Sequence, residues 1–280
     1  MRILLTGRNG QVGWELERVL PPLGEVIATD RATLDLADND AIRRVVRDVK
    51  PDVIVNAAAY TAVDKAESER ELATQVNGVA PGVFAEEAKR LGALLVHYST
   101  DYVFDGEKRA PYVEDDAPNP LSHYARTKLD GERSIRATGC RHLILRTSWI
   151  YGPRTNNFYR IILRKALGNE PMRMVDDQTS VPTPARFLAD STETLLNAGP
   201  EGVLHLVPTG QSTRYSFARE VVKVRGSKSK VDPARTSEFP APATRPVYSA
   251  MDNAKAANLF GEKLPHWQAL LKTAIAKWNY

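Results

Sequence analysis

The chain has 280 residues, of which 42% are hydrophobic and 26% charged, and its formal net charge is +4 at pH 7. These values are those of a globular protein of about two domains, at roughly 100–200 residues per domain, and they exclude a disordered or collagen-like chain. The charge excess is too small to indicate nucleic-acid binding, and no apolar run is long enough to span a bilayer. The single cysteine, Cys140, excludes an internal disulfide. We therefore expect a cytoplasmic protein with no nucleic-acid or membrane partner.

Short apolar runs alternate with longer segments of helical period in the first half of the chain. Strands are predicted at residues 2–5, 25–29, 52–57, 93–99 and 142–147. Helices are predicted between them at residues 12–20, 41–49, 68–91 and 123–137. This alternation predicts βαβ units with right-handed crossovers, and hence an α/β, Rossmann-like doubly wound parallel sheet that forms a dinucleotide-binding domain over residues 1–148.

The alternation becomes less regular in the second half. Helices are predicted at residues 156–167, 185–197, 251–260 and 266–278, and a strand at 203–207. Residues 223–250 are basic and then proline-rich, which predicts an irregular course. We expect residues 149–280 to form mainly a smaller C-terminal α/β substrate-binding domain, with a part at about 176–210 that returns to the first domain.

Three glycines follow the first predicted strand and open the first predicted helix. Gly7, Gly10 and Gly13, with Gln11 and Val12 between them, have the spacing G-x-x-G-x-x-G. Glycines let the backbone turn tightly and approach a pyrophosphate, which free N–H groups and the helix dipole then bind. The alternative is a plain tight turn. Asp30 ends the next predicted strand, which is where an acid that binds the adenosine ribose is expected.

The sequence leaves the choice of nicotinamide cofactor open. Asp30 would accept hydrogen bonds from a ribose 2′-hydroxyl and repel a 2′-phosphate, which favours NADH. Arg8 and Arg31 could instead bind that phosphate, which favours NADPH, although each could simply be exposed to solvent. We expect the protein to use both NADPH and NADH.

Tyr124 and Lys128 are four residues apart at the start of a predicted helix, so both lie on one face. A nearby ammonium should lower the phenol pKa from about 10 and bring proton transfer closer to working pH. The alternative for this spacing is an ordinary amphipathic face. Thr100 follows another predicted strand, where its hydroxyl could bind a substrate carbonyl, or could form an ordinary turn or helix cap.

The glycine turn, Thr100 and the Tyr124–Lys128 pair together resemble the extended short-chain dehydrogenases/reductases. Within that superfamily the chain is similar, through nearly its whole length, to the dTDP-4-dehydrorhamnose reductases. The similarity is carried by the stretches GQVGWEL (10–16), NAAAYTAVDKAE (56–67), YSTDYVF (98–104), RTSW (146–149), DQ (177–178), PT (182–183) and LPHW (264–267). AVDKAE and STDYVF separate this group from nucleotide-sugar epimerases, which share the glycines and the Tyr–Lys pair.

The resemblance implies NADPH- or NADH-dependent reduction of the C4 ketone of dTDP-4-dehydro-L-rhamnose, a nucleotide-sugar substrate, with Tyr124 as proton donor and Lys128 and Thr100 beside it. It also allows a homodimer. The positions that match the family's cofactor contacts beyond the glycine turn are Asp35, Leu36, Ala57, Ala58, Ala59, Tyr60 and Thr61, and those that match substrate contacts are Thr100, Asp101, Trp149 and Val63. Ordinary structural roles remain possible for them: Asp35 as a loop acid, 57–59 as small residues at a crowded strand end, and Trp149 as core.

Two residues depart from the family pattern. Ser180 replaces the usual glycine and Arg214 a usual tryptophan, which puts the local geometry of the substrate domain in doubt. The five scattered histidines have no metal-ligand spacing, so we expect no catalytic metal. Two other functions stay open, a reductase of a different nucleotide-linked 4-keto sugar and a non-catalytic, cofactor-binding regulatory subunit.

Overall fold

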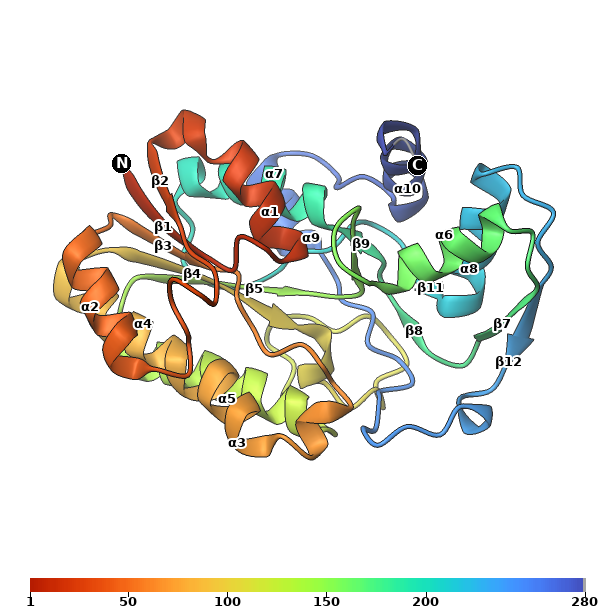
Figure 1. Ribbon diagram of the computed structural model, residues 1–280, viewed down its shortest axis with the longest axis horizontal. Coiled ribbons are helices and arrows are strands. Elements are labelled where there is room, and N and C mark those ends of the chain that lie inside the picture. Colours follow the sequence, from red (N-terminus) through yellow and green to blue (C-terminus); the bar gives the residue numbers. More distant parts are fainter. Residues whose placement is uncertain (279–280) are drawn as a thin grey trace.

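A six-stranded parallel sheet forms the centre of the protein in a computed structural model that describes residues 1–278 (Figure 1). Its order is β10–β5–β4–β3–β1–β2, and its strands are β1 (Arg2–Thr6), β2 (Glu25–Ala28), β3 (Val53–Asn56), β4 (Leu94–Thr100), β5 (His142–Thr147) and β10 (Gly202–His205). This confirms the predicted Rossmann-like α/β class. The strand order reverses between β1 and β3, and such a switch point is where open α/β sheets bind ligands at their carboxyl edge.

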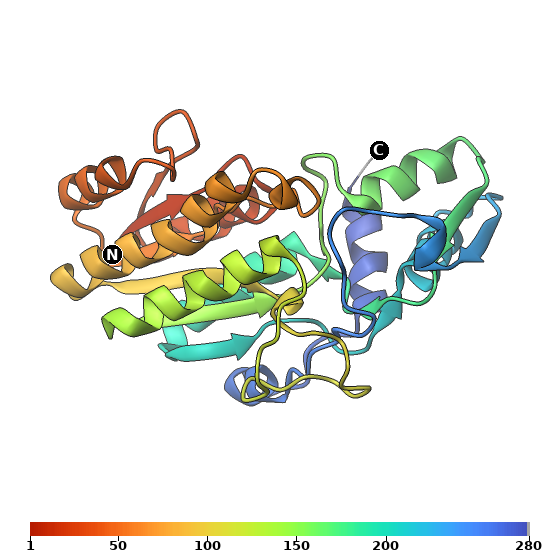
Figure 2. The same ribbon diagram turned by 90° about the horizontal axis from the view of Figure 1, so that it is seen from below.

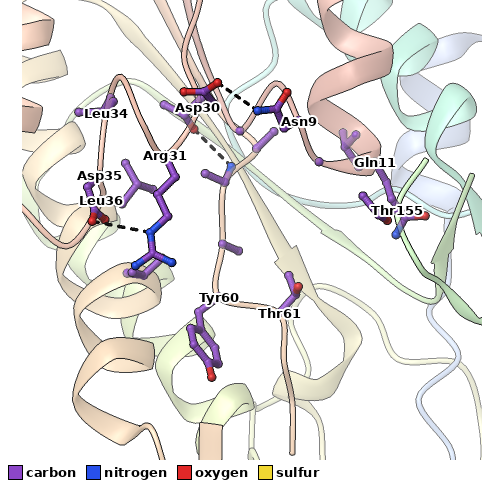
Figure 3. A pocket seen from close by; sticks show the side chains of 18 of the residues that line it. Asn9, Gln11, Asp30, Arg31, Leu34, Asp35, Leu36, Tyr60, Thr61 and Thr155 are labelled. Carbon is purple, nitrogen blue, oxygen red and sulfur yellow. Dashed lines mark hydrogen bonds and ion pairs between the residues drawn. The ribbon is translucent and has the colours of Figure 1, made fainter. Parts of the chain in front are cut away.

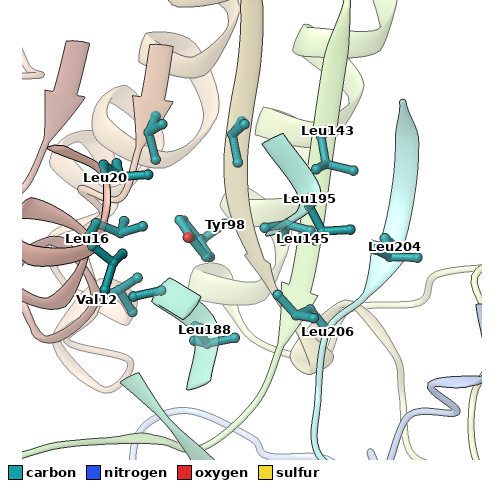
Figure 4. Packing of buried hydrophobic residues seen from close by; sticks show 14 of the residues in the cluster. Val12, Leu16, Leu20, Tyr98, Leu143, Leu145, Leu188, Leu195, Leu204 and Leu206 are labelled. Carbon is teal, nitrogen blue, oxygen red and sulfur yellow. The ribbon is translucent and has the colours of Figure 1, made fainter. Parts of the chain in front are cut away.

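Helices cover both faces of the sheet (Figures 1 and 2). One face packs against α1 (Gln11–Val19), α7 (Ala185–Ala198) and α9 (Ala254–Phe260), and the other against α2 (Asn39–Val49), α4 (Ala80–Leu91) and α5 (His123–Thr138). Alternate residues of β3 serve the two cores: Val53 and Val55 face α1 and α7, whereas Ile54 faces α2 and α4. Strand β3 is therefore apolar from Val53 to Val55, as burial on both faces requires, and its polar residue Asn56 stands at the carboxyl end. Figure 4 shows the first core, with Leu16 of α1 and Leu188 of α7 near Tyr98 of the sheet.

A second, smaller lobe lies beyond the carboxyl edge of the sheet, at the right of Figure 1. Its elements are β6 (Ile150–Tyr151), α6 (Phe158–Leu167), β7 (Met172–Val175), β8 (Thr179–Ser180), β9 (Thr183–Pro184), β11 (Ser212–Thr213), α8 (Arg214–Val224), β12 (Val231–Ala234) and α10 (Trp267–Lys277). It has a core of its own, built around Tyr159, Phe217 and Leu271 of α6, α8 and α10. Within residues 1–278, no helix combines the length and the apolar character needed to cross a bilayer.

Two predicted segments differ from the structure. The helix predicted at 68–91 is interrupted: α3 (Arg70–Thr74) passes through a π-helical turn at Gln75–Val79 before α4 begins. The irregular course predicted for 223–250 is wrong at 231–234, where β12 pairs with β7. Pro233 fits this strand because β12 pairs with β7 on one side only. The missing N–H of the proline therefore costs no hydrogen bond to a second neighbouring strand. Strand β7 and helix α8 were not predicted.

Candidate active site

The glycine turn connects β1 to α1 and approaches the backbone that follows β3. Gly7 has φ +75°, and a Cβ there would lie 2.9 Å from the backbone nitrogen of Ala58. A Cβ on Gly13 would lie 2.1 Å from the carbonyl oxygen of Gly7. Both positions therefore require glycine for close backbone approach, which is the geometry that a pyrophosphate-binding turn needs.

Substituting Gly13 with alanine should weaken NADPH binding by about tenfold or more, because the turn or α1 must move to relieve a backbone clash. Fluorescence titration with NADPH measures the loss. Gly168→Ala is the matched control at the end of α6, since its added methyl meets the flexible side chain of Glu170 and lies at an ordinary 3.7 Å from the backbone oxygen of Arg164. Equal affinities for the two variants would contradict this role of the turn.

A cavity of about 530 Å³ opens beside the glycine turn at the switch point (Figure 3). The predicted cofactor residues that line it are Gly7, Gly10, Gln11, Val12, Asp30, Asp35, Leu36, Ala57, Ala58, Ala59, Tyr60 and Thr61. Gly13, Tyr124 and Lys128 are outside this lining. Sequence reasoning missed Asn9, which lies within the turn itself, and Thr155, which comes from the second lobe and carried no sequence signal.

Asp30 is fixed at one end of the cavity. Its carboxylate accepts hydrogen bonds from the side chain of Asn9 (3.0 Å) and from the backbone N–H groups of Ala32 and Thr33 (both 3.1 Å). The hydrogen bonds from Thr33, followed by that from Asn9, lower its pKa, so the group is ionised at neutral pH. The two arginines expected near a 2′-phosphate both have carboxylate partners: Arg8 binds Glu17, and Arg31 lies 3.7 Å from Asp35.

A buried asparagine holds the backbone of Tyr60, one of the residues that line the cavity. Asn77, in the π-helical turn, accepts from the backbone N–H of Tyr60 (2.8 Å) and donates to its carbonyl (2.9 Å). It also donates to Thr127 of α5 (3.2 Å). The π turn that interrupts the predicted helix thus brings this side chain to Tyr60, which lines the cavity, a use typical of π-bulges.

Thr100 ends β4 and faces the start of α5, which carries Tyr124 and Lys128. The Thr100 hydroxyl caps the turn at Asp101–Val103 by accepting from Tyr102 N–H (3.2 Å), and it also hydrogen-bonds to Tyr124. Helix α5 begins at a serine cap, where Ser122 accepts from Ala125 N–H (3.3 Å). The three predicted catalytic residues therefore come from adjoining ends of one strand and one helix.

The electrostatics of Tyr124 and Lys128 differ from the expectation. Burial raises the pKa of Tyr124, while its hydrogen bond with Thr100 acts against that rise. Burial lowers the pKa of Lys128 to about 8. Lys128 is only 2% exposed, and its ammonium donates to the carbonyl of Tyr98 (2.7 Å) and lies 3.2 Å from His97 Nε2. The expectation that Lys128 lowers the pKa of Tyr124 is wrong, because burial raises that pKa and Lys128 is not among the groups that shift it.

The predicted substrate residues lie where the two lobes meet. Asp101 is buried, and its carboxylate accepts from Ser180 (2.7 Å) and Ser249 (2.5 Å); burial raises its pKa to about 6. Trp149 is half-buried with φ +40°, a left-handed conformation that costs a side-chain-bearing residue about 1–3 kcal/mol and is enriched at functional sites. The guanidinium of Arg214 lies 4.5 Å from the centre of its ring.

Both departures from the family pattern therefore contact a predicted substrate residue. Ser180 adds a hydrogen-bond donor to Asp101, and Arg214 stacks on Trp149. Val63 lies half-buried in the turn after Thr61. Within residues 1–278, no group of three or more His, Cys, Asp or Glu side chains is placed to hold a metal ion.

Known proteins match this chain over nearly its whole length. The family described as RmlD substrate binding domain matches residues 1–280. Among curated relatives, the dTDP-4-dehydrorhamnose reductase of Burkholderia thailandensis is 45% identical, covering 96% of both chains, and that of Escherichia coli is 41% identical, covering 98% of this chain and 97% of the relative. The chain belongs to the dTDP-4-dehydrorhamnose reductase family.

Solved structures of this family have the same fold. The dTDP-4-dehydrorhamnose reductase of Clostridium acetobutylicum superposes with a TM-score of 0.95 at 38% identity, covering 99% of each chain. That of Bacillus anthracis, solved in complex with NADP, also gives 0.95, at 33% identity and 99% coverage of each chain. A UDP-glucose 4-epimerase of Thermus thermophilus shares the fold alone, at 21% identity and a TM-score of 0.85. As a member of this family the protein is an oxidoreductase that uses a nicotinamide cofactor.

Proposed function

We propose that the protein reduces the C4 ketone of dTDP-4-dehydro-L-rhamnose to give dTDP-L-rhamnose, with either NADPH or NADH. The observation that carries the proposal is the position of Thr100, Tyr124 and Lys128 at the same sheet edge as the glycine-lined cavity. The full-length similarity to dTDP-4-dehydrorhamnose reductases supports the choice of substrate.

The residues present fit a dinucleotide. The turn at Gly7 and Gly13 has no space for a Cβ, so its backbone would bind the pyrophosphate together with the N-terminus of α1. Asp30 would bind the adenosine ribose, and Asp35 and Leu36 would line the adenine site. Residues 57–61 would line the nicotinamide half. When bound, NADPH or NADH supplies the hydride for C4.

The chain itself supplies the proton. Tyr124 would donate its phenolic proton to the carbonyl oxygen as hydride reaches C4, which leaves a phenolate and an alcohol. The raised pKa of Tyr124 means that the phenol is fully protonated before each turnover. Thr100, which already hydrogen-bonds to Tyr124, would bind the same carbonyl oxygen and stabilise the developing charge. Lys128 would hold the nicotinamide ribose and stabilise the phenolate. Asp101, Trp149 and Val63 would contribute to the sugar site.

NADPH oxidation with dTDP-, UDP- and GDP-linked 4-keto sugars, with the product identified, tests the proposal. We expect turnover with dTDP-4-dehydro-L-rhamnose and formation of dTDP-L-rhamnose. Faster turnover of a UDP- or GDP-linked sugar would establish the alternative reductase. Cofactor binding without oxidation on any of the sugars would instead indicate a regulatory subunit.

Asp30, two residues beyond β2, should restrain the use of NADPH. Asp30→Asn keeps an oxygen that can accept from Ala32 and Thr33 but removes the charge that repels a 2′-phosphate. We expect the ratio of kcat/KM for NADPH to that for NADH to rise about tenfold. Steady-state kinetics with both cofactors measure this ratio. The exposed carboxylate of Asp40 gives the control Asp40→Asn, which should leave the ratio unchanged. An unchanged ratio in Asp30→Asn would contradict the placement of Asp30 at the ribose site.

The homodimer and the cytoplasmic location stay predictions.

A further inference from the structure

A chain of four buried polar side chains connects the glycine turn to Lys128. The Thr6 hydroxyl, at the end of β1, accepts from Ala58 N–H (3.3 Å) and lies 2.7 Å from Asn56 Oδ1. The other side of the Asn56 amide lies 3.2 Å from His97 Nδ1, and His97 Nε2 lies 3.2 Å from Lys128 Nζ. All four side chains belong to residues that are 1–2% exposed. Each link therefore depends on its protein neighbours for hydrogen bonds.

Lys128 has few other partners. Among residues 1–278, no carboxylate forms an ion pair with its ammonium, and its second contact is the carbonyl of Tyr98. The charged and titratable groups that face it are Glu132 on its own helix and His97 on β4. Glu132 is already bound to Arg146 of β5 and Ser99 of β4. His97 is thus the side chain with which Lys128 makes its direct hydrogen-bond contact.

The imidazole of His97 is neutral, because burial and the neighbouring Lys128 both lower its pKa well below the usual range. A neutral imidazole offers one donor and one acceptor. If Lys128 is an ammonium, it donates to His97 Nε2. The Nδ1–H group of His97 then donates to the Asn56 oxygen, and the Asn56 NH₂ faces Thr6. If Lys128 is an amine, the directions reverse: Thr6 donates to Asn56, Asn56 donates to Nδ1, and Nε2–H donates to Nζ. The asparagine amide can be placed either way, so both arrangements fit the observed positions.

We propose that His97 is a positioning residue for Lys128 and that the tautomer of the His97 imidazole changes with the ionisation of the lysine. This change links Lys128 to Asn56 and Thr6 beside the glycine turn. Between the two arrangements one proton in total leaves to solvent, the histidine stays neutral, and its hydrogen moves from Nδ1 to Nε2. The proposal rests on the proposed function only for its kinetic consequence.

The tautomer itself is measured without any turnover. Long-range ¹H–¹⁵N spectra of histidine-labelled protein distinguish Nδ1–H from Nε2–H, and the His97→Gln variant identifies the His97 signals. We expect His97 to be neutral between pH 6 and pH 9.5. Its hydrogen should be on Nδ1 at the lower pH values and on Nε2 at the higher ones, with the midpoint of the change near pH 8, where Lys128 titrates. In Lys128→Met this change should disappear. A single tautomer throughout the range in the unmodified protein would overturn the proposal, and it would do so whatever the substrate is.

The kinetic consequence is tested by a double-mutant cycle. His97→Leu should lower kcat about tenfold and move the pH profile of kcat, with KM for the sugar nucleotide nearly unchanged. His97→Gln, which restores an oxygen acceptor, should recover most of kcat. In the Lys128→Met background, His97→Leu should have no further effect. An equal loss with and without Lys128 would show a merely structural role. If the unmodified protein shows the tautomer change but no activity, the proposed substrate is wrong and the proposal for His97 stands.

Discussion

Replacing Tyr124 with phenylalanine is expected to lower turnover by about 10²–10⁴-fold, which is the usual contribution of a general acid. The ring would keep its edge-to-face contact with Tyr102, where the ring centres are 6.3 Å apart, so the local packing should persist. Only the hydroxyl that hydrogen-bonds to Thr100 and would protonate the ketone is lost. Cofactor oxidation measured at saturating substrate gives kcat, and fluorescence titration gives NADPH affinity, which should stay close to that of the unmodified protein.

Tyr112→Phe is the matched control. Its hydroxyl donates to Asp105 (2.9 Å) in a loop, and its ring stacks on Phe104, so the substitution removes a phenolic hydroxyl outside the site. The hydroxyl also accepts from the backbone N–H groups of Gly106 (3.0 Å) and Lys108 (3.1 Å), so three hydrogen bonds are lost, all of them outside the site. We expect turnover of Tyr112→Phe to remain within about twofold of the unmodified value. Turnover of Tyr124→Phe at the level of this control would refute the assignment of Tyr124 as proton donor.

Removing Arg146 should produce the largest loss of stability. Its guanidinium donates two hydrogen bonds to the Glu132 carboxylate, at 3.0 and 2.7 Å, and the two side chains are 3% and 2% exposed. Arg146→Met would leave the Glu132 charge buried with no cation bound to it. Breaking one half of such a pair costs about 3–5 kcal/mol, so the free energy of unfolding, measured by urea denaturation, should fall by that amount.

The same helix provides the control for this prediction. Arg133 of α5 forms an ion pair with Asp130, but the two side chains are 66% and 51% exposed. Arg133→Met should therefore change the free energy of unfolding by less than about 1 kcal/mol. A similar loss of unfolding free energy in both variants would mean that burial of the Arg146–Glu132 pair between β5 and α5 does not increase its contribution to stability.

Local sequence patterns determined much of the nucleotide-binding half. The strands β1, β3 and β4 could be located because burial on both faces favours consecutive apolar residues, here at 3–5, 53–55 and 94–96. The glycine turn could be located because only glycine fits where Gly7 and Gly13 approach other backbone. The second lobe was harder to predict. Strand β12 contains a proline and helix α8 has a mixed sequence, and both depend on contacts with β7 and α6, which are distant in the sequence.

By itself, the sequence determined the dinucleotide turn and the Tyr124–Lys128 pair, because each depends on residue types at short spacing. It also determined the α/β class and the family, because local patterns recur along the chain. The tertiary structure alone decided which groups these residues meet. It placed His97 rather than a carboxylate against Lys128, turned Asp101 toward Ser180 and Ser249, and stacked Arg214 on Trp149. It also decided the direction of the Tyr124 pKa, which rises. Burial and pairing between distant segments set the energy of a charge, and neither can be read from the neighbouring residues in the chain.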